Sequence, residues 1–401
     1  NDVLRYFELL EELNLSRNIL HSVGKENFID QKYLKVLNLS FNNLTNIDAK
    51  AFIGLKSLLH LDLSHNSIAE ISVGAFSSSP KLRKLNLSKN RLHTIYSISF
   101  NGLKYLQVLE LCDNFFREIP SESISQLESL ENLQLCRNRL TYLKENELSN
   151  NSNLKIISFL SNSISVIDPN ALQNLTNLKL LNLNDNLLEE VPTPSFKGLK
   201  LLESLDISRN KFTIIRNNAF EGLVNLTNID ISRCPFLEQI ELDSLRKLSN
   251  LRTIIISHNP QVRNLPTYFL TSSSHLKSID LKHNGLQTLS EHSLPLKTLK
   301  LIDLRDNPFK CNCSLLWLGT LLNQKNKSID ISDVRCDGPD KLRGVLIDLR
   351  DNPFKCNCSL LWLGTLLNQQ NKSIDISDVR CDGPDKLRGV YLSRFVISMF
   401  N

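Results

Sequence analysis

The side chain with the most regular chemistry in this sequence is an asparagine amide that returns at intervals of 24 residues. A primary amide both donates and accepts hydrogen bonds, so an inward-pointing asparagine can satisfy backbone groups left open where the chain bends. Cys234 takes one of these places, which predicts a buried thiol there. The asparagines are Asn18, Asn42, Asn66, Asn90, Asn114, Asn138, Asn162, Asn186 and Asn210, then, after slips of one residue, Asn259, Asn284 and Asn307.

Two pairs of reactive side chains hold equivalent places in neighbouring repeats. Cys112 and Cys136 lie 24 residues apart. In stacked repeats their Cα atoms would lie within the range that a disulfide requires, so the alternatives are a bridge and two independent thiols. His258 and His283 share another place; they are either a pH switch or two solvated histidines, and the absence of a paired carboxylate motif favours the second.

A candidate ligand-binding face follows from the outward residues of the repeats. Most are polar or charged, and their charges either neutralise one another across strands or contact a partner protein. Ile156, Leu160 and Leu180 are apolar where other repeats are polar, and apolar anchors inside a polar rim are typical of binding hot spots. The predicted ligand-binding residues are Lys155, Ile156, Ser158, Leu160, Lys179, Leu180, Asp185, Asp206, Arg209, Asp230 and Arg233.

These side chains must be positioned by a repeated frame of leucines. The frame reads LxxLxLxxN, as in Leu34, Leu37, Leu39 and Asn42. It predicts a short strand per repeat and parallel strands about 4.8 Å apart. A second apolar column follows each asparagine by ten residues and predicts a spine on the outer side of the core: Phe28, Phe52, Phe76, Phe100, Ile124, Leu148, Leu172, Phe196 and Phe220, then Phe269 and Leu294.

In this frame the chain resembles the 24-residue class of extracellular leucine-rich repeat proteins over residues 1–309. The resemblance implies an α/β fold: a right-handed leucine-rich repeat solenoid, or horseshoe, of about 13 coils with a parallel sheet on its concave face and a cysteine-rich C-terminal cap. Toll-like receptor, Slit and insect leucine-rich repeat adhesion ectodomains are similar in repeat and cap. The first nine residues match the second half of an earlier repeat.

The segment PFKCNCSLLWLGTLL, followed by RCDGPDKLRGV, resembles the cysteine-rich C-terminal flank of these proteins. In that family a helix bearing a tryptophan, here Trp317, covers the core of the last coil. The resemblance implies the pairs Cys311–Cys336 and Cys356–Cys381. It implies a bond from Cys313 to Cys356 or Cys358 only if both copies of the flank, described next, fold together.

The C-terminal flank occurs twice. Residues 301–345 recur as 346–390 with one difference, Lys325 against Gln370. The copy is either a recent tandem duplication or an error of sequence assembly. We therefore expect a solenoid over 1–309, a first flank over 310–345 and a second flank over 346–401 that ends before its fourth cysteine.

The composition and the absence of certain motifs exclude several classes of function. The net charge of +5 is small for 401 residues, and no basic cluster is interleaved with aromatic residues, so we expect no nucleic-acid partner. The sequence contains no GxSxG, P-loop, HExxH or glycine-rich dinucleotide motif. We therefore expect no enzymatic activity, no metal site and no cofactor.

Several features place the protein in the secretory pathway, outside the cell or at its surface. Cysteines concentrate in the flank, and Asn-x-Ser/Thr sequons are frequent; Asn43, Asn150, Asn174 and Asn225 are the predicted glycosylation sites. Asn14, Asn38 and Asn86 are sequons on the predicted concave face. The chain shows no start Met, no signal peptide and no apolar run of about 18 residues, so we expect a piece of a longer protein.

The sequence thus predicts a protein–protein interaction module. The first hypothesis is the ectodomain of a cell-surface receptor or adhesion protein, with an extracellular protein ligand, a co-receptor or a second copy of the chain as partner. The alternatives are a secreted leucine-rich repeat scaffold or matrix protein and the recruitment domain of a larger enzyme. A membrane contact is expected only through a segment outside this chain, and the sequence beyond Asn401 would discriminate the hypotheses.

Overall fold

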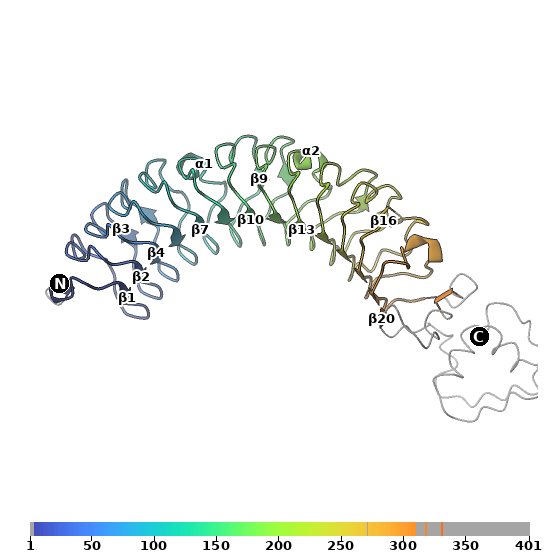
Figure 1. The fold of residues 1–401 in the computed structure, drawn as a ribbon, viewed down its shortest axis with the longest axis horizontal. Coiled ribbons are helices and arrows are strands. Elements are labelled where there is room, and N and C mark those ends of the chain that lie inside the picture. The colour runs from blue at the N-terminus through green and yellow to red at the C-terminus, as the bar shows by residue number, and fades with distance from the viewer. Residues whose placement is uncertain (1–3, 271, 310–316, 319–329, 332–401) are drawn as a thin grey trace, which may run out of the picture. The chain divides into compact units, whose positions relative to one another are not determined.

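The computed structural model describes residues 4–270, 272–309, 317–318 and 330–331 (Figure 1). The chain divides into two compact units. The first comprises Asn1–Phe212 and Asn218–Asp230, and the second comprises Thr213–Asn217 and Ile231–Asn401. Each unit consists of stacked coils with a parallel sheet, which confirms the predicted solenoid of leucine-rich repeats.

The inner sheet of the first unit takes one short strand from each coil. The strands pair in chain order, and every pair is parallel. They run along the inner side of this unit in Figure 1. The strands are β1 (Glu12–Asn14), β2 (Val36–Asn38), β4 (His60–Asp62), β6 (Lys84–Asn86), β7 (Val108–Glu110), β8 (Asn132–Gln134), β10 (Ile156–Ser158), β12 (Leu180–Asn182), β13 (Ser204–Asp206) and β15 (Asn228–Asp230).

The alternation of side chains along each strand separates the core from the face. In β2 the central Leu37 is fully buried, while Val36 and Asn38 on either side point outward and are half-buried. Register pairs Leu37 with Leu61 of β4, so core leucines stack on core leucines. A strand buries every second residue, and the repeat therefore builds one continuous apolar core and one polar face.

The outer side of the first unit carries short elements. They are β3 (Asn46–Ile47) paired with β5 (Glu70–Ile71), β9 (Tyr142–Leu143) paired with β11 (Val166–Ile167), α1 (Ser121–Ile124), α2 (Thr193–Phe196) and the 3-10 turn η1 (Leu4–Tyr6). Phe52, Phe76 and Phe100 form the predicted spine beneath them, with ring centroids 5.7 Å and 6.0 Å apart in successive pairs. Gly54 has a φ of +99° and closely approaches the carbonyl of Phe28, where no side chain fits.

The second unit also contributes short parallel inner strands. Strands β17 (Thr253–Ile255), β18 (Ser278–Asp280), β19 (Leu301–Asp303) and β20 (Asp330–Ile331) pair in this order. Outside it, β14 (Ile214–Ile215) pairs with β16 (Gln239–Ile240), and η2 (Glu291–Ser293) forms a single turn. Leu318 is buried, and the indole of Trp317 donates to the carbonyl of Leu289 at 3.0 Å, as the predicted cover of the last coil requires.

The predicted cap cysteines lie outside the described residues. They are Cys311, Cys313, Cys336, Cys356, Cys358 and Cys381. The same is true of most of the two flanks, 310–345 and 346–401. In the part of the chain that is described, no helix is long and apolar enough to cross a membrane.

The asparagine ladder joins successive coils, as its amide chemistry predicts. Asn42 donates to the carbonyls of Leu15, Leu39 and Ser40 at 3.0, 3.0 and 3.2 Å, and its oxygen accepts from the amide of Leu20 at 3.0 Å. Equivalent bonds recur at the buried asparagines that follow in the first unit. Cys234, in the second unit, is a buried cysteine, as predicted.

Candidate functional site

Each strand of the first unit presents outward residues that line up with those of the next strand. Register places Ile156 beside Leu180, and Ser158 beside Asn182. Ile156 and Leu160 are half-buried, whereas Leu180 is 37% exposed and Ser158 only 7%. We call the surface formed by Ile156, Ser158, Leu160 and Leu180 the central face. Ile156 and Ser158 lie on β10, Leu160 follows this strand and Leu180 lies on β12, and the buried Ser158 forms the floor.

The predicted rim charges of the central face are mostly neutralised within the chain. Lys155 pairs with Glu131 at 2.9 Å, and Lys179 pairs with Glu203 at 2.8 Å. Asp185 accepts a hydrogen bond from the hydroxyl of Ser161 at 2.7 Å. Exposed pairs of this kind contribute little to stability. Both lysines of the rim are thus paired within the chain. Arg209 is exposed and has no ion pair among the described residues.

The remaining predicted residues lie further along the sheet. Asp206 on β13 accepts from the amide of Ser208 at 3.0 Å and from the side chain of Asn184 at 3.3 Å. Asp230 is the last residue of β15. Arg233 is exposed and belongs to the second unit.

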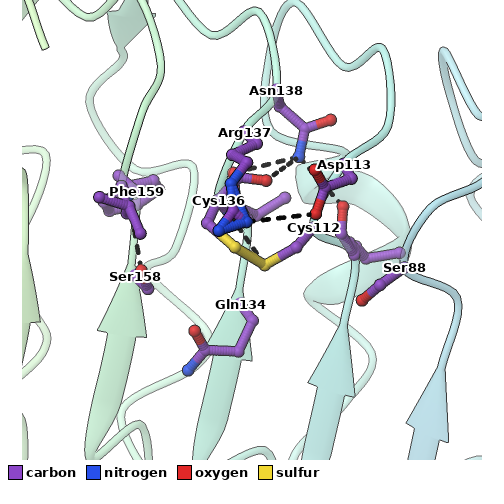
Figure 2. Close-up of a disulfide and its surroundings, with 12 residues drawn as sticks. Ser88, Cys112, Asp113, Gln134, Cys136, Arg137, Asn138, Ser158 and Phe159 are labelled. Carbon is purple, nitrogen blue, oxygen red and sulfur yellow. Dashed lines mark hydrogen bonds and ion pairs between the residues drawn. A yellow bond between two sulfur atoms is a disulfide. The ribbon is translucent and has the colours of Figure 1, made fainter. Parts of the chain in front are cut away.

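A disulfide lies in the same column as Leu160, one rung away. Cys112 and Cys136 form it, with Cα atoms 4.5 Å apart, which decides between the two alternatives left by the sequence. Figure 2 shows the bridge just beyond the ends of two neighbouring strands, with Asp113 and Arg137 beside it. Their ion pair spans 3.6 Å. The bridge fixes two successive turns and extends the uncharged surface next to Leu160.

The residue before each ladder asparagine has a left-handed backbone that sequence reasoning missed, although the predicted residues Asp185 and Arg209 stand in this column. Arg17, Phe41, His65 and Lys89 occupy these places with φ of 56°, 53°, 52° and 56°. Arg17 lies over the ring of Phe41 at 5.1 Å, and that ring stacks on His65 at 3.9 Å. The only sequence signal for this column is its fixed place one residue before the asparagine.

In the second unit the rings of His258 and His283 are in contact, and charged side chains surround them. The rings of His258 and His283 lie 4.4 Å apart, and His283 reaches Asp306 at 3.2 Å. Burial lowers the pKa of His258 below 6.5, and the positive charges of Arg233, His283 and Lys282 lower it further, whereas Asp280 opposes them. The expected absence of a nearby carboxylate is therefore wrong for His283, because Asp306 follows at the equivalent place in the next coil.

The four predicted glycosylation sites are all accessible. Asn43, Asn150, Asn174 and Asn225 are exposed. Asn225 donates to the carbonyl of Lys200 at 2.9 Å, a bond on the surface of the coil. Exposure is the condition that a modified asparagine must satisfy in the folded chain, since a glycan is bulky and solvated.

Comparison with solved structures shows the same architecture. The chain matches the APL1 leucine-rich repeat domain with a TM-score of 0.65 and 24% identity, covering 84% of this chain and 83% of that one. It matches the TLR13–ssRNA13 complex with a TM-score of 0.64 and 24% identity (84% and 56% covered). For the Toll–Spatzle complex of Drosophila the values are 0.61 and 21% (86% and 55%). The chain thus spans little more than half of the TLR13 and Toll chains.

Family comparisons agree with the coils. No curated protein sequence matches the chain. The model described as Leucine rich repeat C-terminal domain matches residues 333–357 and 378–401. The model described as Leucine rich repeat matches residues 8–68, 60–114, 80–140, 128–188, 176–236 and 249–309. With more than half of its length matched in this way, the chain belongs to the leucine-rich repeat family.

Proposed function

We propose that this chain is the ectodomain of a cell-surface receptor or adhesion protein and that its central face binds a protein ligand or co-receptor. The leucine-rich repeat fold is typical of protein-binding scaffolds without enzymatic activity. Solved neighbours include the Toll–Spatzle and LRIM1/APL1C complexes. Assembly with other proteins is thus a use to which related folds are put.

The observation that carries the proposal is an apolar pair on the outward face of the strands. Ile156 and Leu180 lie side by side where most strands present polar or charged residues. The nearest lysines, Lys155 and Lys179, are already paired with glutamates. A partner that covers the pair therefore removes apolar surface from water without stripping an unpaired lysine of its hydration, which is the arrangement of a hot spot with a polar rim.

Rigidity of the surroundings supports binding. The disulfide between Cys112 and Cys136 fixes the turns beside Leu160, and the asparagine ladder bonds each coil to the one before it. A surface held in one conformation loses little entropy when a partner docks. The central face is thus suited to bind a folded protein rather than to close around a small molecule.

The extracellular location rests on redox chemistry and on accessible sequons. Disulfides persist in oxidising compartments and are rare in the cytosol. The bridge between Cys112 and Cys136 therefore favours the secretory pathway, as do the exposed sequon residues Asn43, Asn150, Asn174 and Asn225. Reading the full-length transcript past both ends tests the receptor assignment: a membrane span supports it, and a stop codon after the second flank would replace it by a secreted scaffold.

The binding role is tested by a matched pair of substitutions. Leu180 on the central face is 37% exposed, and Leu201 outside the strands is 43% exposed. The chain, fused to a multimerising tag, is screened against displayed extracellular proteins, and affinity for the selected protein is measured by surface plasmon resonance. We expect Leu180→Asp to weaken binding by about 30-fold, a hot-spot loss of about 2 kcal/mol, and Leu201→Asp to change it less than about twofold. Equal affinities for Leu180→Asp and the unsubstituted chain refute the proposal.

A further inference from the structure

The residue immediately before each inner strand forms a column whose charges differ between the two units. In the first unit its lysines pair with glutamates on the neighbouring coil. Lys35 binds Glu11 at 2.8 Å, and the pairs of Lys155 and Lys179 with glutamates follow the same rule. Opposite charges on adjacent rungs stabilise a sheet, and like charges destabilise it. In the first unit each lysine of the column thus has an acidic neighbour.

In the second unit the same column holds three bases in succession. Arg252, Lys277 and Lys300 precede β17, β18 and β19. The amide of Lys277 donates to the carbonyl of Arg252, and that of Lys300 to Lys277, each at 2.8 Å, so the three residues stand on adjacent rungs. Their spacing is about 4.8 Å. All three are exposed, and none has an ion pair among the described residues.

The acids of β18 and β19, Asp280 and Asp303, do not neutralise the column. Lys282 lies 3.0 Å from Asp280 and 3.8 Å from Asp303, and Arg305 binds Asp303 through two contacts of 2.9 and 2.6 Å. These carboxylates are engaged by bases on the other edge of the face. Around the column the second unit is basic, with eleven Lys and Arg against seven Asp and Glu over residues 213–217 and 231–309. The uncompensated charges face solvent and attract an external anion.

Apolar groups adjoin the basic column and narrow the chemistry of that anion. Leu301, next to Lys300, is 42% exposed, and Ile255 is half-buried on β17 in a column that otherwise carries polar residues. A sulfated polysaccharide offers nothing apolar to cover these side chains. Single-stranded nucleic acid binds by stacking bases on aromatic rings, and the strands of this sheet carry none.

We propose that Arg252, Lys277, Lys300 and Leu301 form a second docking surface, which binds an acidic segment of a partner protein. Carboxylates of the segment contact the three bases in charge-assisted hydrogen bonds, and an apolar side chain of the segment covers Leu301. The column also steers an acidic partner during encounter. This surface lies wholly in the second unit, so the proposal stands or falls independently of the central face.

The test uses two synthetic peptides and the whole chain. One peptide is rich in Glu and has a central Leu, and the other has Ser in place of that Leu; a heparin oligosaccharide is the third probe. Binding is measured by isothermal titration calorimetry at low and high salt with the variants Lys277→Glu, Lys297→Glu and Leu301→Ser. Lys297 is an exposed lysine of the same unit outside the column, so its reversal changes net charge equally.

The expected result is that Lys277→Glu weakens binding of the Leu peptide by about 10-fold or more and flattens its salt dependence, whereas Lys297→Glu changes affinity less than about twofold. Leu301→Ser is expected to weaken binding of the Leu peptide but not binding of the Ser peptide. Charge alone does not produce such a dependence of one substitution on the other. Equal losses for the two lysine reversals overturn the proposal. Failure of the Leu peptide to bind also overturns the proposal. So does a heparin oligosaccharide that binds more tightly than the Leu peptide and whose affinity is unchanged by Leu301→Ser. Circular dichroism confirms that each variant is folded.

Discussion

Replacing Asn186 by alanine removes one rung of the asparagine ladder from the middle of the first unit. Asn186 is 3% exposed. Its amide nitrogen donates to the carbonyls of Phe159, Leu183 and Asn184 at 3.0, 3.0 and 3.3 Å. Its oxygen accepts from the amide of Ile164 at 3.0 Å. The methyl group of alanine can neither donate nor accept a hydrogen bond, so the substitution removes all four of these bonds.

The loss of unfolding free energy in Asn186→Ala depends on which other hydrogen bonds each backbone partner of Asn186 keeps. The carbonyl of Phe159 keeps a bond from Asn162, that of Leu183 keeps one from Asn210, and that of Asn184 keeps the amide of Ser161. These three losses cost about 0.5 kcal/mol each. The amide of the fully buried Ile164 has no second acceptor and costs about 2 kcal/mol when left unpaired. The sum is about 3 to 4 kcal/mol.

A control variant lies at the start of the same ladder. Asn18 is exposed and donates only to its own coil, to Leu15 at 3.0 Å and Ser16 at 3.2 Å. Water can replace those bonds, so Asn18→Ala is expected to cost less than about 1 kcal/mol. Because a solenoid need not unfold in one step, the assay combines urea unfolding with hydrogen exchange at the amide of Ile164.

Exchange at that amide is expected to accelerate by about 100-fold in Asn186→Ala, which corresponds to about 3 kcal/mol. In Asn18→Ala it is expected to stay at the level of the unsubstituted chain. Unchanged protection of Ile164 in Asn186→Ala would refute the argument, since the orphaned amide is its largest part. Equal destabilisation by the two variants would show that each asparagine stabilises only its own turn and that its hydrogen bonds to the neighbouring coil contribute nothing.

Three further predictions concern sulfur and imidazole groups. Replacing both Cys112 and Cys136 by serine is expected to lower the free energy of unfolding by about 3 kcal/mol, because the bridge closes a loop of 24 residues; urea titration without a reductant measures this, and an unchanged free energy of unfolding in the double variant contradicts it. Cys234→Asn is expected to raise the melting temperature of the second unit, because an amide nitrogen donates to the carbonyl of Ser232 more strongly than the thiol does at 3.6 Å; a lower temperature counts against it. The pKa of His258 lies below 6.5, so the unfolded state takes up its proton first and the second unit loses stability as the pH falls through about 6.5. His258→Gln should flatten that profile in thermal melts at stepped pH, and an unaltered slope argues otherwise.

The core of the solenoid could be predicted from the sequence because burial there is decided by side-chain type at a fixed period. Leu37, Leu61 and Phe76 are apolar at regular places, and each is at most 1% exposed. The inward asparagines followed from the same period and from the two-sided chemistry of an amide. The apolar pair Ile156 and Leu180 could likewise be read from the column, since both stand at outward places.

Contacts that depend on side-chain rotamers were not predictable. The spacing of Cys112 and Cys136 allowed a bridge or two thiols, and only the orientation of the Cβ atoms decides between them. The left-handed backbone of Phe41 and His65 was also invisible, because such φ values ordinarily indicate glycine or asparagine. Here the bonds of the following asparagine hold the turn and override that preference. The bases Arg252 and Arg233 are near in sequence but stand in different columns, which the register of the strands reveals.

The ladder has a consequence for how this kind of chain changes length over evolution. Each buried asparagine bonds to its own coil and to the one before it, and the bonds of Asn42 recur at Asn90 and Asn186. Insertion or loss of one whole coil therefore recreates the same junction on both sides of the change. A coil one residue longer, between Cys234 and Asn259, keeps part of this junction. Asn259 still donates to the carbonyl of Ile231, as Asn42 does to Leu15, whereas its oxygen accepts from the amide of Cys234 itself at 2.8 Å. Gain of a coil thus adds new outward side chains while every existing junction is inherited intact, so recognition surfaces can diversify by recombination between coils without redesign of the core.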